Sequence, residues 1–254
     1  MHIMSWALSD VGRRRDQNED HFLTNSKLGL FAVADGMGGH LGGARASELA
    51  VTIIEKELQQ IPAEDTAPVV PLVEPAQARH LRMAIRSANH IIHEIAENNS
   101  DLNGMGTTLT ALLFSHGRVH LAHVGDSRAY LYRDGMLDQI SQDHTWIEEQ
   151  VRAGILTRED AEQSSLKHVI TRSVGFELDV EIDLITLPVL AGDCFILCSD
   201  GLTNHLHRDH LVHAITSNYY CALPDKLVTL ANQLGGEDNI TAVVIYVANQ
   251  VANS

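Results

Sequence analysis

Aromatic residues and positive charges are both scarce in this chain of 254 residues. Phe, Trp and Tyr together make up 5% of the residues although 44% are hydrophobic, so we expect a core built mainly from Ala, Val, Ile and Leu. There are 18 Lys and Arg residues against 33 Asp and Glu, which gives a net charge of −15. Because affinity for nucleic acids and anionic membranes depends largely on Lys and Arg, this balance argues against both partners.

Long apolar runs are also missing from the chain. No stretch of about 18 apolar residues is present, so we predict no membrane span. The basic run Arg13-Arg14-Arg15 follows the apolar residues of the N-terminus, which is the reverse of the order in a signal peptide. The three cysteines fit a reducing compartment. Two of them, Cys194 and Cys198, would lie about 13 Å apart on a strand, too far for a disulfide. We expect a cytoplasmic protein.

The apolar residues that are present follow strand and helix patterns. Helical spacing predicts helices over 44–59 and 78–98. An Asp-Gly pair at Asp134 and Gly135 predicts a hairpin, and the prolines between Pro62 and Pro75 predict a surface loop. Apolar runs bounded by Gly, Asp or Pro predict strands at residues 29–34, 108–114, 119–124, 129–132, 180–187, 194–198 and 240–247. We expect an α+β fold in which helices cover largely antiparallel sheets.

We read residues 1–254 as one domain with an insert at about residues 144–167. Thr145 and Glu148 match a capping box, and Gly154 is placed to end the short helix that follows. The insert is either a structural excursion between strands or a mobile flap near a functional site, and the pattern alone favours neither.

Acidic residues recur beside glycines or other small residues at separate points of the chain. Most of them follow or adjoin an apolar run that is typical of a buried strand, so several strand ends could bring their carboxylates together. Hard divalent cations such as Mg²⁺ and Mn²⁺ prefer such oxygen ligands. The pattern therefore predicts a metal-dependent hydrolase that uses Glu19, Asp20, Asp35, Asp126, Asp200 and Asp238.

The surroundings of these acids suggest a phosphate ester as the substrate. On an extended segment Arg15 and Glu19 face the same side, which suits a phosphate beside a metal because a guanidinium grips two phosphate oxygens. After Asp35, the glycine-rich turn allows the Gly36 carbonyl to reach a ligand position. A cysteine-nucleophile phosphatase is excluded, since the positions six residues after the three cysteines are not arginine.

Nine runs of the sequence resemble, in the same order, the metal-dependent serine/threonine protein phosphatases of the PPM family (type 2C), in their compact bacterial form. These runs are DVG at 10–12, RDQNED at 15–20, DGMGGH at 35–40, GTT at 106–108, VGDSRAY at 124–130, DHT at 143–145, ITR at 170–172, SDGL at 199–202 and GGEDNIT at 235–241. The resemblance implies a central antiparallel β-sandwich flanked by α-helices on both faces.

The resemblance also implies a dinuclear Mn²⁺ or Mg²⁺ centre at one end of that sandwich. By position, Asp35 bridges the two metals, and Asp200 and Asp238 hold the first. The Gly36 carbonyl and, through water, Glu19 hold the second. The two cations activate a water that hydrolyses phosphoserine or phosphothreonine directly, without a phosphoenzyme intermediate.

Further roles follow from the same resemblance. Asp20 orients the metal ligands by hydrogen bonds, and Asp126, with Asp200, forms a weaker third metal site. Arg15 binds the substrate phosphate. Eukaryotic members carry a histidine where this chain has Met37, so the proton donor for the leaving alkoxide is either His40 or a metal-bound water.

The insert at residues 144–167 corresponds to the variable flap of the family. The expected partners are phosphorylated Ser/Thr proteins, namely the targets of a bacterial serine/threonine kinase and the kinase itself, and we expect a monomer. Two alternatives stay open at this point. One is a catalytically silent, phosphoprotein-binding family member, and the other is a phosphatase for small phosphate esters.

Overall fold

Two antiparallel β-sheets form the centre of the protein. The computed structural model describes residues 2–38, 41–61, 74–162, 164, 166 and 168–249. The first sheet has the strand order β1 (His2–Asp10), β11 (Ile240–Ala248), β10 (Cys194–Cys198), β7 (Arg128–Arg133) and β8 (Met136–Gln139). The second has the order β2 (Asp20–Asn25), β3 (Leu30–Met37), β5 (Leu109–Ser115), β6 (Arg118–Val124) and β9 (Asp183–Pro188), with the short β4 (Gly106–Thr107) paired to β3.

The two sheets pack face to face around an apolar interior. Phe114 packs between two other rings, with its ring centroid 5.7 Å from that of Phe31 and 5.3 Å from that of Phe195 in edge-to-face arrangements. Aliphatic residues such as Leu112, Leu197 and many others complete this layer. The core therefore rests mainly on Ala, Val, Ile and Leu, as the composition predicts, and three of the five phenylalanines pack between the sheets.

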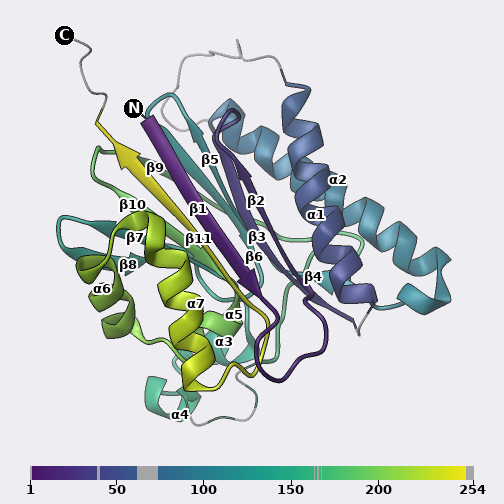
Figure 1. The fold of residues 1–254 in the computed structure, drawn as a ribbon. Coiled ribbons are helices and arrows are strands. Elements are labelled where there is room, and N and C mark those ends of the chain that lie inside the picture. Colours follow the sequence, from purple (N-terminus) through teal and green to yellow (C-terminus); the bar gives the residue numbers. More distant parts are fainter. Residues whose placement is uncertain are drawn as a thin grey trace.

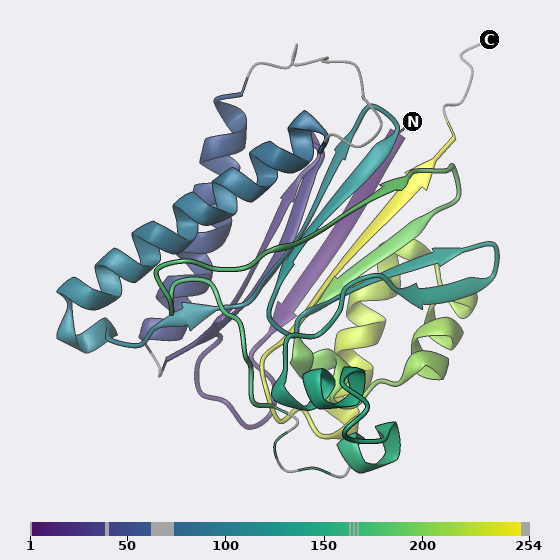
Figure 2. The same ribbon diagram turned by 180° about the vertical axis from the view of Figure 1, so that it is seen from behind.

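A pair of helices covers each outer face of the sandwich (Figures 1 and 2). The helices α1 (Gly42–Gln59) and α2 (Ala76–Asn98) bury their apolar stripes on the second sheet. On the first sheet lie α6 (Arg208–Ser217) and α7 (Leu223–Leu234). The result is the predicted four-layer arrangement of helices, sheet, sheet and helices.

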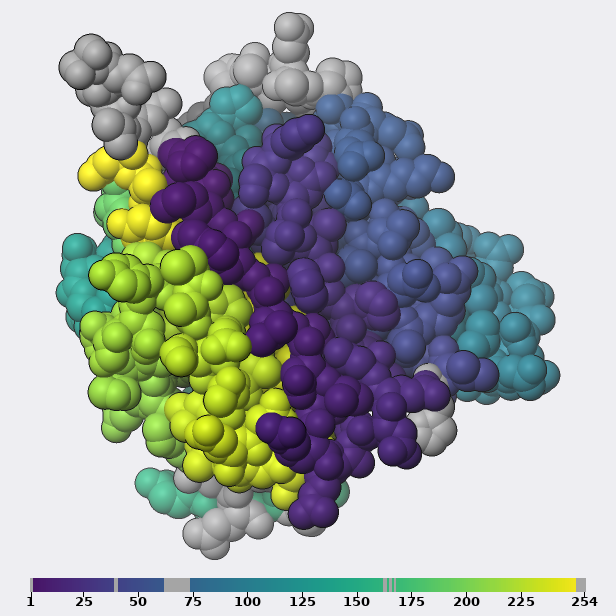
Figure 3. All heavy atoms as spheres, viewed as in Figure 1, coloured from purple at the N-terminus to yellow at the C-terminus, as the bar shows by residue number. Residues whose placement is uncertain are grey.

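Five short helical segments connect these layers. They are η1 (Ser100–Leu102), α3 (Trp146–Arg152), α4 (Arg158–Glu162), α5 (Asp200–Thr203) and η2 (Tyr220–Ala222). In the space-filling view, the N-terminal segment in purple runs along the C-terminal part of the chain in yellow (Figure 3). The pairing of β1 with β11 thus joins the two ends of the described chain in one sheet.

Most of the predicted elements are confirmed. The hairpin joins β7 to β8 through Asp134 at φ 51° and Gly135 at φ 81°. The hydroxyl of Thr145 caps α3 by accepting from the Glu148 N–H at 3.3 Å, but the Glu148 carboxylate faces Arg158 instead of closing the capping box. Gly154 follows that helix with φ 70°. The predicted proline-rich loop lies mostly outside the described residues.

Besides several short segments, the strands β1 and β2 and the helices α6 and α7 were not predicted. Both β1 and β2 are edge strands whose side chains are mostly half-buried or exposed, so they lack a continuous apolar run. The helix α6 carries Val, Ile, Thr and His residues, all of middling helix propensity. The helix α7 could have been predicted, because Pro224 occupies its first turn, where proline favours the start of a helix. Tertiary packing thus outweighs weak local preference at these positions.

Two predicted absences can be compared with the structure. Cys194 and Cys198 are buried, unpaired residues of one strand, β10, as expected. Within the described residues, no helix combines the length and the apolar character that crossing a membrane requires.

Candidate metal centre

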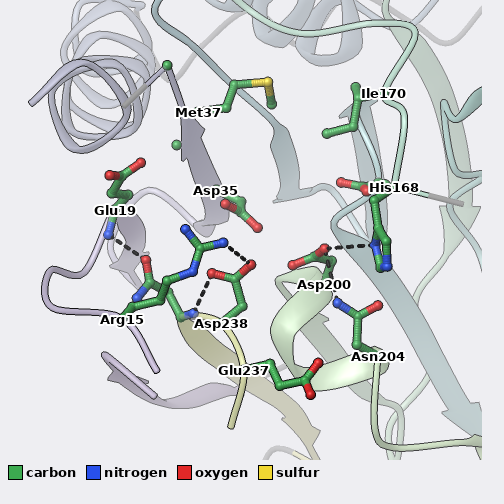
Figure 4. Close-up of a pocket in the computed structure, with 14 residues that line it drawn as sticks. Arg15, Glu19, Asp35, Met37, His168, Ile170, Asp200, Asn204, Glu237 and Asp238 are labelled. Atoms are coloured by element: carbon green, nitrogen blue, oxygen red, sulfur yellow. Dashed lines mark hydrogen bonds and ion pairs between the residues drawn. The ribbon is translucent and has the colours of Figure 1, made fainter. Parts of the chain in front are cut away.

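A pocket of about 560 Å³ lies at the end of the sandwich where the acidic residues meet (Figure 4). Strand β3 delivers Asp35, β10 leads through Ser199 into Asp200, and β11 begins directly after Asp238 and Asn239. Seven residues that the sequence analysis names as ligands or phosphate contacts line it: Arg15, Glu19, Asp35, Gly36, Asp126, Asp200 and Asp238. The fold therefore brings together residues from five separate parts of the chain.

Two predicted site residues stand apart from that lining. Asp20, at the start of β2, pairs in register with Asp35 and is 5% exposed, so it lies behind the pocket wall. His40 lies outside the described residues, and its assignment as proton donor stays a prediction.

The backbone of Asp35 is held on both sides by two threonines. Its N–H donates to the Thr108 hydroxyl at 2.9 Å. Its carbonyl accepts from the Thr107 hydroxyl and from the Thr108 N–H, both at 2.9 Å. Three hydrogen bonds therefore fix the point from which the Asp35 carboxylate enters the pocket.

Glycines allow the first turn of α1 to press against the acidic residues. A Cβ atom at Gly43 would overlap the Glu19 carboxylate, and one at Gly36 would overlap the Gly43 carbonyl. The Gly36 N–H also donates to the Glu19 carbonyl at 3.2 Å. Side chains at either glycine would thus displace Glu19 and the Gly36 peptide, which are both predicted on the metal side of the pocket.

Asn239 holds the loop that carries Arg15 and Glu19. Its Nδ2 donates to the Val11 and Gln17 carbonyls, each at 2.9 Å, and its Oδ1 accepts from the Glu19 N–H at 2.8 Å. Asn239 is 5% exposed, so this amide links the N-terminal loop to β11 inside the protein. The sequence analysis did not assign it a role, because the partners are more than 200 residues away along the chain.

Arg15 reaches into the pocket and pairs with Asp238. One Nη of the guanidinium lies 2.8 Å from Asp238 Oδ2. The second oxygen of that carboxylate accepts from the Asn239 N–H at 2.8 Å. Both ion-pair partners are partly exposed, so the pair contributes little to stability and the arginine is available to another anion.

Asp20 is a buried carboxylate with one unsatisfied oxygen. Its Oδ2 accepts from the hydroxyls of Ser199 and Thr241, each at 2.7 Å, whereas its Oδ1 has no hydrogen-bond partner. Burial raises the pKa of Asp20 to about 7 against these two hydrogen bonds, and repulsion from Asp200 and Asp238 adds to the rise.

Other carboxylates around the pocket also have a raised pKa. Burial is the first cause for each: it raises the pKa of Asp126 to about 8 and the pKa of Asp35 and Asp200 above their ordinary value. Repulsion among the acids is the second cause, since Asp20 acts on Asp35 and Asp238 acts on Asp200. A cluster of this kind favours protons or cations over free negative charge.

The pocket fits a hard divalent cation by the chemistry of its donors. The described lining contains six carboxylates and one arginine, together with the Gly36 peptide. Among the described residues, no three His, Cys, Asp or Glu side chains already surround one point. Mg²⁺ sites retain several waters and need only one or two carboxylates for each ion, so spread oxygen ligands suit them. The unsatisfied Asp20 Oδ1 behind the wall agrees with this fit.

Sequence reasoning also missed Asn204 and His168, which line the pocket as well. The Asn204 amide donates to Asp200 Oδ2 at 3.2 Å, and its position four residues after Asp200 on one helical turn is a signal that could have found it. His168 Nδ1 lies 3.9 Å from the same oxygen. His168 follows the insert, and no pattern in the sequence indicated its approach.

The base of the insert is tied to the loop that carries Asp126. The His144 N–H donates to the Gly125 carbonyl at 2.8 Å, and His144 Nδ1 accepts from the Gly125 N–H at 3.1 Å. The Thr171 N–H, from the other end of the insert, donates to the His144 carbonyl at 2.9 Å. Both ends of the insert therefore meet beside the pocket, which agrees with a flap, while its motion stays a prediction.

The chain was compared with protein families and with known proteins. The family model described as protein phosphatase 2C matches residues 12–235. The chain is 37% identical over 241 residues to the serine/threonine phosphatase stp of Listeria monocytogenes, covering 93% of each chain.

Solved structures show the same likeness. The serine/threonine phosphatase PstP/Ppp of Mycobacterium tuberculosis superposes with a TM-score of 0.85 at 36% identity, covering 97% of this chain and 99% of that one. A structure of the PstP catalytic domain in complex with two manganese ions has a TM-score of 0.84 at 36% identity, with the same coverage. The chain therefore belongs to the protein phosphatase 2C family.

Proposed function

We propose that this protein is a metal-dependent protein serine/threonine phosphatase and that the acidic pocket is its active site. The observation that carries the proposal is the joint lining of the pocket by six carboxylates and one arginine at converging strand ends. Membership of the protein phosphatase 2C family supports the reaction, and the two manganese ions of the PstP structure support the metal.

The chain's own residues would hold two Mn²⁺ or Mg²⁺ ions. Asp35 would bridge them, Asp200 and Asp238 would serve the first, and the Gly36 carbonyl and Glu19 would serve the second. When bound, the ions would activate water and neutralise charge on the transferring phosphoryl group. The Asp35 and Asp200 carboxyl groups, whose pKa values are raised, would release their protons to water when the cations bind and would then balance the charge of the cations.

The surrounding residues keep the ligands in place. Asp20 bonds Ser199 and Thr241 from behind, which fixes the junction between β10, β11 and β2. Asn239 fixes the loop of Arg15 and Glu19. Pre-set positions of this kind lower the reorganisation needed when charge develops in the reaction.

Arg15 would bind the substrate phosphate at the edge of the pocket. Its guanidinium now pairs with one carboxylate oxygen of Asp238, and a phosphate offers two oxygens in the matching geometry. No Cys or Ser is found among the described lining residues, which supports direct attack by water rather than a phosphoenzyme on such a side chain.

Three finer assignments belong to the same proposal. Asp126, 7% exposed, would form a weaker third metal site with Asp200. His40 or a metal-bound water would protonate the leaving alkoxide. The substrates would be phosphoproteins made by a bacterial serine/threonine kinase, including that kinase, and the enzyme would act as a monomer.

Phosphate release from a phosphothreonine peptide tests the proposal. The protein is stripped of metal and assayed with Mn²⁺, Mg²⁺, Ca²⁺ or EDTA. We expect turnover with Mn²⁺ or Mg²⁺ and none in EDTA. If folded protein releases no phosphate under any metal, the phosphatase function is wrong and the protein is a silent phosphoprotein-binding member of its family.

A further inference from the structure

A second cleft, of about 610 Å³, opens beside the metal pocket. It lies between the β7–β8 hairpin at the edge of the first sheet, the short helix α4 and the start of α6 (Figure 1). Three arginines line it, Arg128, Arg158 and Arg208, together with His207. Asp138 is the only acid among the described residues of this lining.

The cleft adjoins the metal pocket at the end of α5. Thr203 lines the cleft, and its neighbour Asn204 lines the metal pocket. Residues of the two cavities also interact electrostatically, since the charge of Arg128 in the cleft acts to lower the pKa of Asp126 in the metal pocket. An extended chain whose phosphate lies in the pocket can therefore pass over α5 into the cleft.

Two of the arginines keep donors available for a ligand. Arg208 donates from Nε to the Leu137 carbonyl at 3.0 Å, and within the described residues its two Nη groups have no protein acceptor. Arg158 lies 3.3 and 3.4 Å from the Glu148 carboxylate, and its side chain is 74% exposed. A contact of that length and exposure is weak and readily exchanged.

The third arginine has a structural role. Arg128 donates from Nε and Nη2 to the Asp143 carboxylate at 2.7–3.1 Å, so its charge is largely balanced inside the protein. Asp143 and Glu148 line an adjoining smaller cleft of about 300 Å³, which shares Arg128 and Arg158 with the larger one. Binding of an anion would therefore rest on Arg158 and Arg208.

The charge of this cleft contrasts with the rest of the molecule. The chain has a net charge of −15, so an acidic peptide is repelled from most of its surface. Beside the active site, Arg158 and Arg208 face one aspartate in the described lining of the larger cleft, while Arg128 is balanced by Asp143. We propose that it binds acidic side chains next to the phosphorylated residue, so that the protein prefers phosphoprotein segments rich in Asp and Glu. This inference rests on the proposed function.

Matched phosphothreonine peptides test the inference. One pair carries Glu or Gln on the N-terminal side of the phosphothreonine, and a second pair carries them on the C-terminal side. On the Mn²⁺-loaded protein we expect kcat/KM about 5–10-fold higher for the Glu peptide of one pair, through a lower KM with similar kcat. The preference should shrink as salt is raised, because the guanidinium groups are exposed.

Variants then assign the preference to the cleft. The double variant Arg158→Gln/Arg208→Gln should reduce the Glu-over-Gln ratio to about 1–2, and Arg208→Lys should retain most of it, since the charge is preserved. Arg86→Gln, at an exposed position of α2 on the opposite outer layer, is the control and should leave the ratio unchanged. Equal KM values for Glu and Gln peptides, or a ratio unaffected by the double variant, would overturn the inference.

A binding measurement separates this inference from the proposed function. Fluorescence anisotropy is recorded with labelled Glu and Gln peptides that carry a non-hydrolysable phosphonate. Tighter binding of the Glu peptide that depends on Arg158 and Arg208, without turnover of any substrate, would retain the cleft and reject the phosphatase. Turnover of the phosphopeptides with no difference in binding between the Glu and Gln peptides would support the phosphatase function and reject the role of the cleft.

Discussion

Two of the buried carboxylates, those of Asp20 and Asp193, have opposite surroundings. Asp193 is 1% exposed and receives two hydrogen bonds of 2.7 Å from Arg133 and one of 2.7 Å from the Leu190 N–H. Asp20 is 5% exposed, has only two hydroxyl donors for one oxygen, and faces other acids.

This difference distinguishes an aspartate that stabilises the fold from aspartates that are suited to bind a ligand. At Asp193 the fold supplies the balancing cation itself, so the pair ties β7 to the turn before β10. At the pocket end the fold places acids close to one another, and the arginine that pairs with one of them, Arg15, is partly exposed at its edge. A buried carboxylate that the protein leaves unbalanced indicates where an external cation binds.

The largest effect should follow from changing an acid of the pocket. We expect Asp35→Asn to lower kcat/KM at least ~10³-fold, because the proposed bridging ligand is lost. Thermal unfolding of the metal-free protein should be unchanged or slightly raised, since repulsion among the acids is relieved. Near-normal turnover by the purified variant would reject Asp35 as a ligand.

The opposite result is expected at the paired acid. Asp193→Asn leaves Arg133 without its partner and should lower the free energy of unfolding by about 2–3 kcal/mol, since the arginine is partly exposed. Denaturant unfolding measures this loss, and kcat at a temperature where the variant is folded should stay within about twofold. A comparable loss of stability in Asp35→Asn would show that the two acids have the same role.

A smaller effect is expected at the edge of the pocket. Arg15→Ala should raise KM for a phosphothreonine peptide about tenfold while kcat changes less, because one bidentate phosphate contact is removed. Arg14→Ala, the neighbouring exposed arginine that does not line the pocket, is the matched control. An unchanged KM in Arg15→Ala would exclude phosphate binding by this residue.

The smallest effect, a few degrees in Tm, concerns pH. The pKa of Asp20 rises to about 7 and that of Asp126 to about 8 from an ordinary 3.8, so between about pH 4 and 8 the folded, metal-free state holds more protons than the unfolded state. These acids therefore destabilise the metal-free protein progressively as pH rises through that window. Bound Mn²⁺ replaces the protons, so the gain in Tm on adding Mn²⁺ should widen with pH.

The difference in Tm with and without Mn²⁺ also excludes the effects of ionisable groups outside the pocket. Burial lowers the pKa of His120 and His123 to about 4, which destabilises the protein as pH falls below about 6.5. That contribution is common to both curves and cancels in their difference. A gap between the curves that is independent of pH would contradict the account of the pocket acids.

The positions of Asp35, Asp200 and Asp238 in the pocket could be predicted from the sequence because each of the three adjoins a strand with a strong local signal. The apolar runs before Asp35 and Asp200 are buried strands, and Asp238 precedes a third. Local pattern is enough there, since the strand direction determines where the acid emerges.

The rest of the site depends on contacts between distant segments. Asn239 bonds Val11, Gln17 and Glu19, and His168 reaches Asp200 from beyond the insert. Neither residue carries a pattern of its own, so the three-dimensional packing alone assigns them. The pairing of Arg15 with Asp238 is of the same kind, because spacing related Arg15 only to Glu19.

Crystals of the protein soaked in Mn²⁺ would test the central claim most directly, by anomalous diffraction at the manganese edge. The account predicts two strong peaks in the pocket, between Asp35, the Gly36 carbonyl, Asp200 and Asp238, with Arg15 released from Asp238 toward a bound phosphate. Peaks only elsewhere on the protein, with the Arg15–Asp238 pair intact and the pocket acids uncoordinated, would contradict it.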